Sequence, residues 1–341
     1  MILVSHGAKK NVGDYLIHSR GRAILEQLLP GESLVSFPRW DPIPADLIGR
    51  ARAVVLCGGP GLTRDFYPGT FRLVPNIHDV NVPVLPLALG WSGRPAQDPF
   101  SFNFDPPSHE ALKAIHAGLG WSSVRDDLSL DIMKSCGVEQ VRRSGCTAWY
   151  HLPSLGKRFV SPGQVRSLVF TTPASPRLFG QAFKLMKRLA SRYPTIDRWC
   201  VFHRGIGHDK ETRRRTAYAN YMLARVASAL KFTVVDGSSD LSKIDFYGDV
   251  DLHVGYRVHA HLAFLSQRRG SILVSEDGRG VGQALTFGDP YRLVASEPDL
   301  VDRVESAVDT EVGSWDATRR AIEEIERSWP VMRETVLQLR S

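Results

Sequence analysis

Short apolar runs alternate with stretches of helical periodicity along the first part of the chain. The apolar runs are bounded by polar or glycine-rich turns, and they predict buried strands at residues 1–5, 34–37, 53–57, 82–89 and 122–125. The stretches between them predict helices at residues 14–29, 45–51, 109–117 and 127–136. Regular alternation of strands and helices is typical of a doubly wound α/β sheet with parallel strands.

A segment rich in proline, glycine and serine, residues 151–163, interrupts this pattern and predicts a domain boundary. Beyond it, strands are predicted at residues 167–171, 199–203, 232–235, 251–255 and 272–275. Helices are predicted at residues 181–192, 210–230 and 315–341, the last interrupted at Pro330.

The predicted fold is therefore α/β, with two Rossmann-like domains facing each other across a cleft. We expect an N-terminal domain over residues 1–155, a C-terminal domain over 164–325, and a C-terminal helix over 326–341 that crosses back onto the first domain. Ligands of open α/β sheets bind at the carboxyl ends of the strands. The loops that follow the strands are where a site is expected.

The composition restricts the class of protein. The chain has 341 residues and a net charge of +7, and a basic excess suits nucleic acid, an anionic membrane or an acidic substrate. Because no RNP motif, zinc finger or basic zipper is present, we expect no nucleic-acid partner. No apolar run is long enough to span a bilayer, and residues 1–14 resemble a buried strand more than a signal peptide.

The cysteines argue against a metal centre. The sequence has four of them, scattered and without a CxxC pair, which indicates neither a zinc site nor a disulfide framework. We therefore expect free thiols, no metal and a cytoplasmic location.

The segment from residue 255 to residue 280 carries the strongest chemical signal. It predicts a strand end, a turn, a helix, a second strand and a glycine loop, with Arg257 and His259 where the helix begins. The N–H groups of a helix N-terminus and the guanidinium of Arg257 suit a phosphate or a carboxylate. His259 can move a proton near neutral pH. An anion clamp beside a proton-transfer group indicates catalysis; the alternative for His259 is a structural histidine.

Two loops of the first predicted domain place small and polar residues after strands. Before the first long helix, Gly13 allows a tight turn and Asp14 suits a helix N-cap. These roles are structural, and the alternative is that Asn11, Asp14 and the loop amides face a substrate. The glycine-rich segment 58–61 lets the backbone at Gly59 approach a ligand, although it lacks the full pattern of a dinucleotide or phosphate loop.

Positively charged residues follow several predicted strands. Arg177, His203, Arg204 and His208 follow strands of the second domain, where together they would form an anion site at one sheet edge. Arg125 ends a strand of the first domain, and it either reaches an anion in the cleft or pairs with a neighbouring aspartate. For each residue taken alone, a solvated loop charge is the alternative.

Two predicted helices carry runs of basic residues, at 184–192 and at 213–215. Such runs are ordinarily solvated faces. The alternative is peripheral, salt-sensitive contact with an anionic membrane.

Taken together, these segments resemble the polysaccharide pyruvyltransferase family. Five segments of the family have counterparts here, in the same order. They are Asn-x-Gly-Asp at residues 11–14, a Gly-rich segment at 58–62, Val-Arg-Asp-x-x-Ser at 124–129, Arg-Leu-His-Ala at 257–260 and a Tyr-Asp-x-Lys-like segment at 275–279. Three positions differ from the family's pattern, since Pro60 replaces a glycine, Val258 a leucine and Arg279 a lysine.

The resemblance implies a GT-B-like fold and a role in building cell-envelope polysaccharide. It implies transfer of pyruvate from phosphoenolpyruvate to two hydroxyls of a saccharide, free or lipid-linked, with formation of a ketal and without a cofactor or a metal. The location would be cytoplasmic, with peripheral contact at the inner face of the membrane.

The resemblance also implies roles for individual residues. His259 would transfer a proton, as acid or as base, because a helix dipole lowers and a bound anion raises a histidine pKa. The C-terminal domain would bind the donor and the N-terminal domain the acceptor. The residues expected to bind substrate are Arg257, Val258, Arg177, Arg279, Arg125, Asn11, Gly13, Asp14 and Gly59.

Two other classes of protein remain compatible with these residues. One is a glycosyltransferase of the same fold that uses a nucleotide sugar, since a basic cleft suits a diphosphate as well. The other is a non-catalytic, anion-binding relative.

Overall fold

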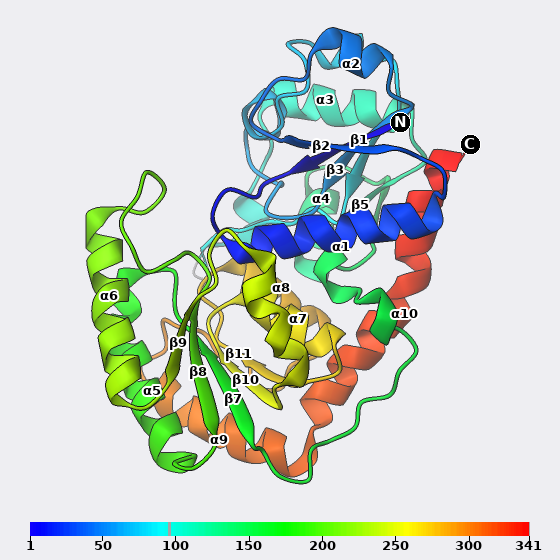
Figure 1. Cartoon of the computed structure of the whole chain (residues 1–341). Helices are drawn as coiled ribbons and strands as arrows, with labels where there is room; N and C mark the ends of the chain where they lie inside the picture. Colours follow the sequence, from blue (N-terminus) through cyan, green and yellow to red (C-terminus); the bar gives the residue numbers. More distant parts are fainter. Residues whose placement is uncertain (95–96, 341) are drawn as a thin grey trace.

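The computed structural model describes residues 1–94 and 97–340, and Ser341, included in the predicted C-terminal helix, lies outside them. Two separate parallel sheets form the two halves of the molecule (Figure 1). The first has the order β2-β1-β3-β4 and contains β1 (Ile2–His6), β2 (Leu34–Pro38), β3 (Ala53–Cys57) and β4 (Val84–Leu87). A bridge from Leu89 to Val124 links it to the pair β5 (Ser122–Val124) and β6 (Val141–Arg143).

The second sheet has the order β11-β10-β7-β8-β9. Its strands are β7 (Ser167–Thr171), β8 (Asp197–Phe202), β9 (Thr233–Asp236), β10 (Leu252–Gly255) and β11 (Gly270–Leu273). All pairings in both sheets are parallel, so each strand must be reached by a crossover, and this confirms the predicted α/β class. The sequence missed β6.

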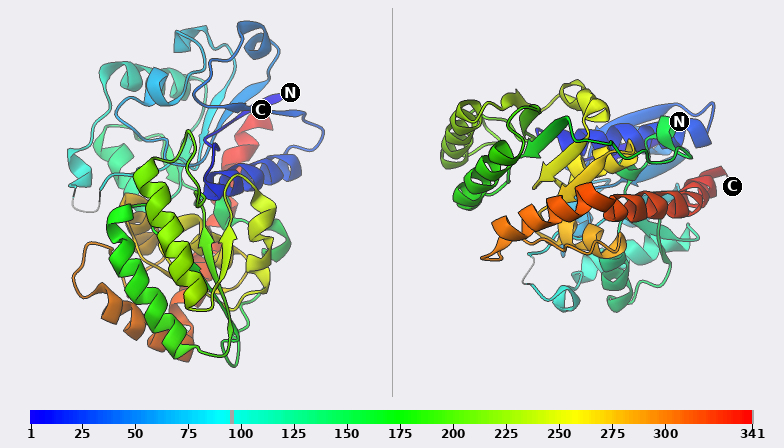
Figure 2. Two further views of the ribbon diagram at one scale, coloured as in Figure 1. Left: turned by 60° about the vertical axis from the view of Figure 1, so that its left-hand side comes forward. Right: turned by 90° about the horizontal axis from the view of Figure 1, so that it is seen from below.

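Helices cover the sheets and fill the space between them (Figures 1 and 2). The first half contains α1 (Val12–Leu28), α2 (Ala45–Gly49), α3 (Pro106–Ala117) and α4 (Asp127–Ser135). The second contains α5 (Phe179–Arg192), α6 (Arg214–Ala229), α7 (Val258–Ser266), α8 (Gly278–Thr286), α9 (Leu300–Ser314) and α10 (Asp316–Leu337). Helices α1 and α7 touch where the halves meet, and one buried cluster includes Ile17 of α1, Phe264 of α7 and Ile325 of α10.

Helix α10 runs from the second half to the first, where it contacts β5 and β6 (Figure 1). It continues through Pro330, so the predicted interruption there was wrong. A proline inside a helix costs roughly 3 kcal/mol. The buried residues Ile325, Met332 and Val336, on both sides of the proline, supply the packing that offsets this cost.

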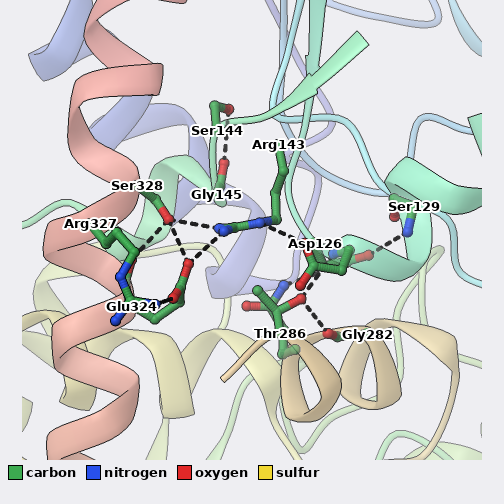
Figure 3. Close-up of polar contacts among 12 residues, drawn as sticks. Asp126, Ser129, Arg143, Ser144, Gly145, Gly282, Thr286, Glu324, Arg327 and Ser328 are labelled. Atoms are coloured by element: carbon green, nitrogen blue, oxygen red, sulfur yellow. Dashed lines mark hydrogen bonds and ion pairs between the residues drawn. The ribbon is translucent and has the colours of Figure 1, made fainter. Parts of the chain in front are cut away.

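Polar contacts also join the halves (Figure 3). Arg143 of β6 donates to Ser328 at 2.7 Å and to Glu324 at 2.5 Å, both on α10. The amide of Asp127 donates to the hydroxyl of Thr286 on α8 at 2.9 Å. These contacts hold the β5–β6 pair and α4 against helices α8 and α10 of the second half.

Several helix starts differ from the prediction by one to four residues, and two of them bear on the site. Helix α1 begins at Val12 with Asn11 at the N-cap, so the assignment of Asp14 to the N-cap and of Gly13 to a turn was wrong. The amide of Val12 donates to the carbonyl of His203 at 3.0 Å, which fixes the start of the helix to the second half. Helix α6 begins at Arg214, later than predicted, and the loop before it borders the cleft.

Within the described residues, no helix is long and apolar enough to cross a membrane. All four cysteines are free thiols.

Candidate active site

Strand β10 lies between β11 and β7 in the second sheet and leads directly into α7, as predicted. Arg257 is the N-cap residue of α7, Val258 is its first residue and His259 its second. The short loop leaves the side chains of Arg257 and His259 at the carboxyl edge of the sheet, facing the first half. Arg257 and His259 are 8% and 5% exposed.

The guanidinium of Arg257 is incompletely paired. Its Nη2 donates to the carbonyl of Pro173 at 3.0 Å, and its buried Nε has no hydrogen-bond partner among the described residues. Burial lowers the pKa of Arg257 to about 10, partly offset by the charge of Glu276. A buried cation with an unused donor is costly unless an anion completes it. An anionic ligand would supply the missing partner of Arg257.

Three adjoining cavities meet at Arg204, which follows β8. We call them the outer, deep and side cavities, with volumes of about 360, 20 and 230 Å³. Arg204 lines all three, and Arg257 lines the deep and side cavities. Since the deep cavity holds little more than a water molecule, a larger ligand would contact Arg257 from the side cavity. Arg204 was noted in the sequence as a strand-exit cation but not chosen as a site residue.

The deep cavity contains the predicted catalytic residue. Val258 and His259 line it, together with Asn11 from the first half and Arg279 from α8. Asn11 and Arg279 also line the outer cavity. The structure thus brings together residues from the segments 11–14, 257–260 and 275–279, which are far apart in the sequence.

The surroundings of His259 favour its neutral form. Burial, followed by the positive charges of Arg279 and Arg125, lowers the pKa of His259 to about 3. The helix N-terminus acts in the same direction. A neutral imidazole has a lone pair that can accept a proton, although so low a pKa also makes it a weak base.

Two acidic residues lie beside these cations. Glu276 accepts hydrogen bonds from the amides of Ala174 and Ser175, at 2.8 to 3.1 Å. Asp277 pairs with Arg279 at 2.6 Å; against the effect of burial, the hydrogen bonds from Arg279 lower the pKa of Asp277. The carboxylate of Asp277 thus orients Arg279 and offsets part of its charge.

The first half supplies the opposite wall. Asp14 lines the outer cavity with Gly59, whose φ of +78° belongs to the turn after β3. Burial raises the pKa of Asp14, and a hydrogen bond from Asn11 and the nearby arginines oppose the rise. Gly13 packs directly against the ring of His259. The acceptor-side residues predicted from the sequence therefore lie at or next to the cavities.

Two predicted residues are placed differently. Arg125 is buried, and it forms an ion pair with Asp126 at 2.9 Å and donates to the carbonyl of Trp91. It acts on His259 through its charge but lines none of the three cavities. Arg177 is exposed on the turn Pro176–Leu178 and also lines none of them.

The outer cavity contains residues that the sequence reasoning missed. Arg39 and Trp40 follow β2, and Lys9 stacks over Trp40 with its Nζ 4.3 Å from the ring centre. Because Arg39 and Trp40 come directly after a predicted strand, their position could have marked them as candidate site residues. An indole beside cations suits the face of a sugar ring and its polar substituents.

His253 and His261 line none of the three cavities. Their Nδ1 atoms lie 2.8 and 2.7 Å from the hydroxyl of Ser271. Among the described residues, no group of histidines, cysteines or carboxylates could hold a metal ion.

The two parallel sheets, with cation-lined cavities where they face each other, are typical of a GT-B-like fold. The sequence matches the polysaccharide pyruvyl transferase family over residues 11–278, and the protein belongs to this family. It is thus a transferase that acts on a polysaccharide and moves a pyruvyl group. A search of curated proteins found no match.

Solved structures share the fold at low sequence identity. MnaA of S. aureus, in a structure with UDP, is 12% identical with a TM-score of 0.54, covering 98% of this chain and 93% of that chain. UDP-GlcNAc 2-epimerase from Neisseria meningitidis, bound to UDP-GlcNAc, is 9% identical with a TM-score of 0.56, covering 99% of this chain and 100% of the other. A UDP-GlcNAc 2-epimerase from Methanocaldococcus jannaschii is 9% identical, with a TM-score of 0.53 and coverage of 94% and 98%. These similarities show the GT-B-like fold.

Proposed function

We propose that the protein transfers pyruvate from phosphoenolpyruvate to two hydroxyl groups of a saccharide and forms a ketal. The observation that carries the proposal is the buried, incompletely paired Arg257, with Arg204 lining the same cavities and His259 two residues away. Phosphoenolpyruvate has a phosphate and a carboxylate within one small molecule. Arginine forks bind both groups well.

The donor would lie where the cavities meet. Arg257 and Arg204 would bind its phosphate or carboxylate. Arg279, which pairs with Asp277, would neutralise further negative charge on the donor. Backbone amides at the start of α7, including that of Val258, add donors and a favourable dipole. Arg125 would contribute through its charge, and Arg177 would act only on a ligand that extends beyond the cavities.

The chemistry moves one proton from oxygen to carbon. The first hydroxyl adds to C2 of the donor while its proton is transferred to the methylene carbon, which becomes a methyl group. The phosphate then leaves with its bonding electrons, and the second hydroxyl closes the ketal and loses its proton to phosphate or solvent. No oxidant or reductant is needed.

His259 would carry the first of these protons. Its low pKa leaves the imidazole neutral, with a lone pair that can take the hydroxyl proton, but also makes it a weak base until the donor binds. The negative charge of the bound donor would raise that pKa, which favours the transfer. The protonated imidazole could then deliver the proton to the methylene carbon. Positioned proton transfer of this kind contributes roughly 10²–10⁴-fold to the rate.

The acceptor would approach from the first half. Asn11, Asp14 and Gly59 line the outer cavity on that side, and Gly13 fixes the distance to His259. The cavity of about 360 Å³ has room for a sugar unit. We infer a saccharide acceptor attached to a lipid or a polymer, and a cytoplasmic protein that works at the inner face of the membrane in building the cell envelope.

A second candidate is transfer from a nucleotide sugar, because the structurally similar epimerases were solved with UDP or UDP-GlcNAc. A thermal-shift panel with phosphoenolpyruvate, UDP-sugars and GDP-sugars separates the two functions, since a ligand that binds the folded state raises its stability. Of the ligands in this panel, we expect only phosphoenolpyruvate to raise the melting temperature. Stabilisation only by a nucleotide sugar would contradict the proposal, and binding without turnover would favour an anion-binding protein.

A further inference from the structure

Helix α6 carries large apolar side chains on its exposed face. Tyr218, Tyr221 and Met222 expose 69%, 53% and 37% of their surfaces. At 3.6 residues per turn, the three lie within an arc of about 100°. Scattered exposed apolar residues are ordinary, whereas a cluster on one helix face marks an interaction surface.

Arginines border this cluster. Arg214 and Arg225 fall within the same arc of about 100° and Arg215 lies at its edge, and α6 contains no acidic residue. The basic run on α5 differs, because Arg188 lies 3.5 Å from Glu305 of α9 and Arg192 pairs with Asp309. On α5, all of whose residues the structure describes, Phe183 is by contrast the one large apolar side chain with more than a third of its surface exposed, and two of the basic residues face the acidic residues of α9.

The start of α6 adjoins the candidate active site. Thr216 and Asn220 line the side cavity with Arg204 and Arg257. Asn220 lies on the opposite side of the helix from Tyr218. A surface that docks on the exposed face would leave the cavity-lining face free. Figures 1 and 2 show α6 at the outer edge of the second half, with α5 beside it.

We propose that this α6 face, formed by Tyr218, Tyr221, Met222 and the flanking arginines, docks on an anionic lipid surface. Tyrosine rings have an apolar body and a polar tip, which suits the boundary between headgroups and acyl chains. Arginines are attracted to the negative potential of anionic lipids. Charge complementarity thus selects a lipid surface rather than an apolar partner protein.

This inference deepens the proposed function, because docking would hold the cleft beside a lipid-linked acceptor. Its test does not use catalysis. If vesicle binding fails while phosphoenolpyruvate still stabilises the protein, only the membrane proposal is rejected. If the protein binds vesicles but phosphoenolpyruvate does not stabilise it, only the proposed function is rejected.

The test is sedimentation with vesicles of phosphatidylcholine alone or with about one third phosphatidylglycerol. The protein should sediment with the anionic vesicles only, and roughly 0.5 M salt should release it. Tyr218→Ser/Tyr221→Ser/Met222→Ser should lower the ratio of bound to free protein on the order of tenfold or more, since its apolar anchor is gone. Arg214→Gln/Arg215→Gln/Arg225→Gln should have a similar effect.

A matched control removes exposed apolar groups elsewhere. Phe100 and Val160 are 59% and 80% exposed, and Phe100→Ser/Val160→Ser should bind vesicles like the unaltered protein. Absence of sedimentation, equal sedimentation with neutral vesicles, or normal binding by the α6 triple variants would overturn the proposal. So would a dimer in light scattering that the tyrosine and methionine changes convert to a monomer, because the face would then contact a second copy.

Discussion

The α-carbon of Gly13 in helix α1 lies against the imidazole of His259 in helix α7. A β-carbon at Gly13 would lie 2.5 Å from Nδ1 of His259 and 2.8 Å from its Cβ and Cγ. These distances are shorter than real β-carbon contacts, so only a glycine lets the two helices approach this closely. The first half of the molecule therefore sets the position of the proposed proton-transfer residue of the second.

Replacing Gly13 by alanine should displace His259. We expect the transfer rate to fall on the order of 10²-fold, because a displacement near 1 Å is enough to misalign a proton transfer. Overpacking should also cost roughly 1–3 kcal/mol of stability. The rate is measured under single-turnover conditions, beside thermal unfolding.

Gly180 offers a matched control. It is also the second residue of its helix, α5, and a β-carbon there would meet no atom within 4 Å. Gly180→Ala should leave the rate unchanged and stabilise the protein by up to about 1 kcal/mol. If Gly13→Ala behaved in the same way, the contact with His259 would have no functional importance.

Arg257→Ala should weaken binding of phosphoenolpyruvate by roughly 1.5–3 kcal/mol, the contribution of a hydrogen bond to a charged group. Arg257→Lys should recover only part of this, since lysine keeps the charge but loses the planar fork. Isothermal titration calorimetry on folded variants gives both values. Unchanged affinity in the alanine variant would remove Arg257 from the donor site.

Arg204 and Arg177 both follow strands of the second sheet, but only Arg204 lines the cavities. Arg204→Gln should therefore weaken phosphoenolpyruvate binding by about 1 kcal/mol or more, and Arg177→Gln should have a smaller effect. The same titration compares the two. A larger loss in the Arg177 variant would mean that the donor lies outside the cavities described above.

Buried histidines should make the protein sensitive to acid. Burial lowers the pKa of His259 and of His261 to about 3, and it also lowers the pKa of His253 and His203. Unfolding returns each to about 6.5, so the unfolded chain binds more protons below that pH. The contribution of these neutral histidines to the free energy of unfolding is therefore fully present above pH 6.5. It falls as the pH drops toward 3, by up to about 1.4 kcal/mol per histidine per pH unit. Urea unfolding at pH 7.5 and 5.5 checks this, and equal stability at both would contradict it.

Local patterns were enough to predict much of the fold. Strands β3 and β7 have the predicted bounds, because a short buried apolar run next to a turn depends on nearby residues alone. Pro330 misled the prediction, since the packing that keeps α10 continuous comes from residues distant in the sequence. The start of α1 was misplaced for a similar reason, as it is fixed by the carbonyl of His203.

The site was predicted in part. Arg257, His259, Asn11 and Arg279 follow strands or open helices, and the rule that strand ends meet at one edge brings them together. Arg39 obeys the same rule but lies in a segment without a motif. The contact between Gly13 and His259 was not predictable, because it depends on how closely two helices from different halves approach.

The central claim, proton transfer by His259 during pyruvyl transfer from phosphoenolpyruvate, is tested most directly with His259→Gln. Glutamine keeps much of the volume and some hydrogen bonding but cannot carry a proton. Single-turnover transfer to a saccharide, followed by phosphate release and by the mass of the ketal product, should slow by roughly 10²–10⁴-fold. Titration with phosphoenolpyruvate should show nearly unchanged affinity, because the arginines remain. A near-normal rate in a folded variant would contradict the account.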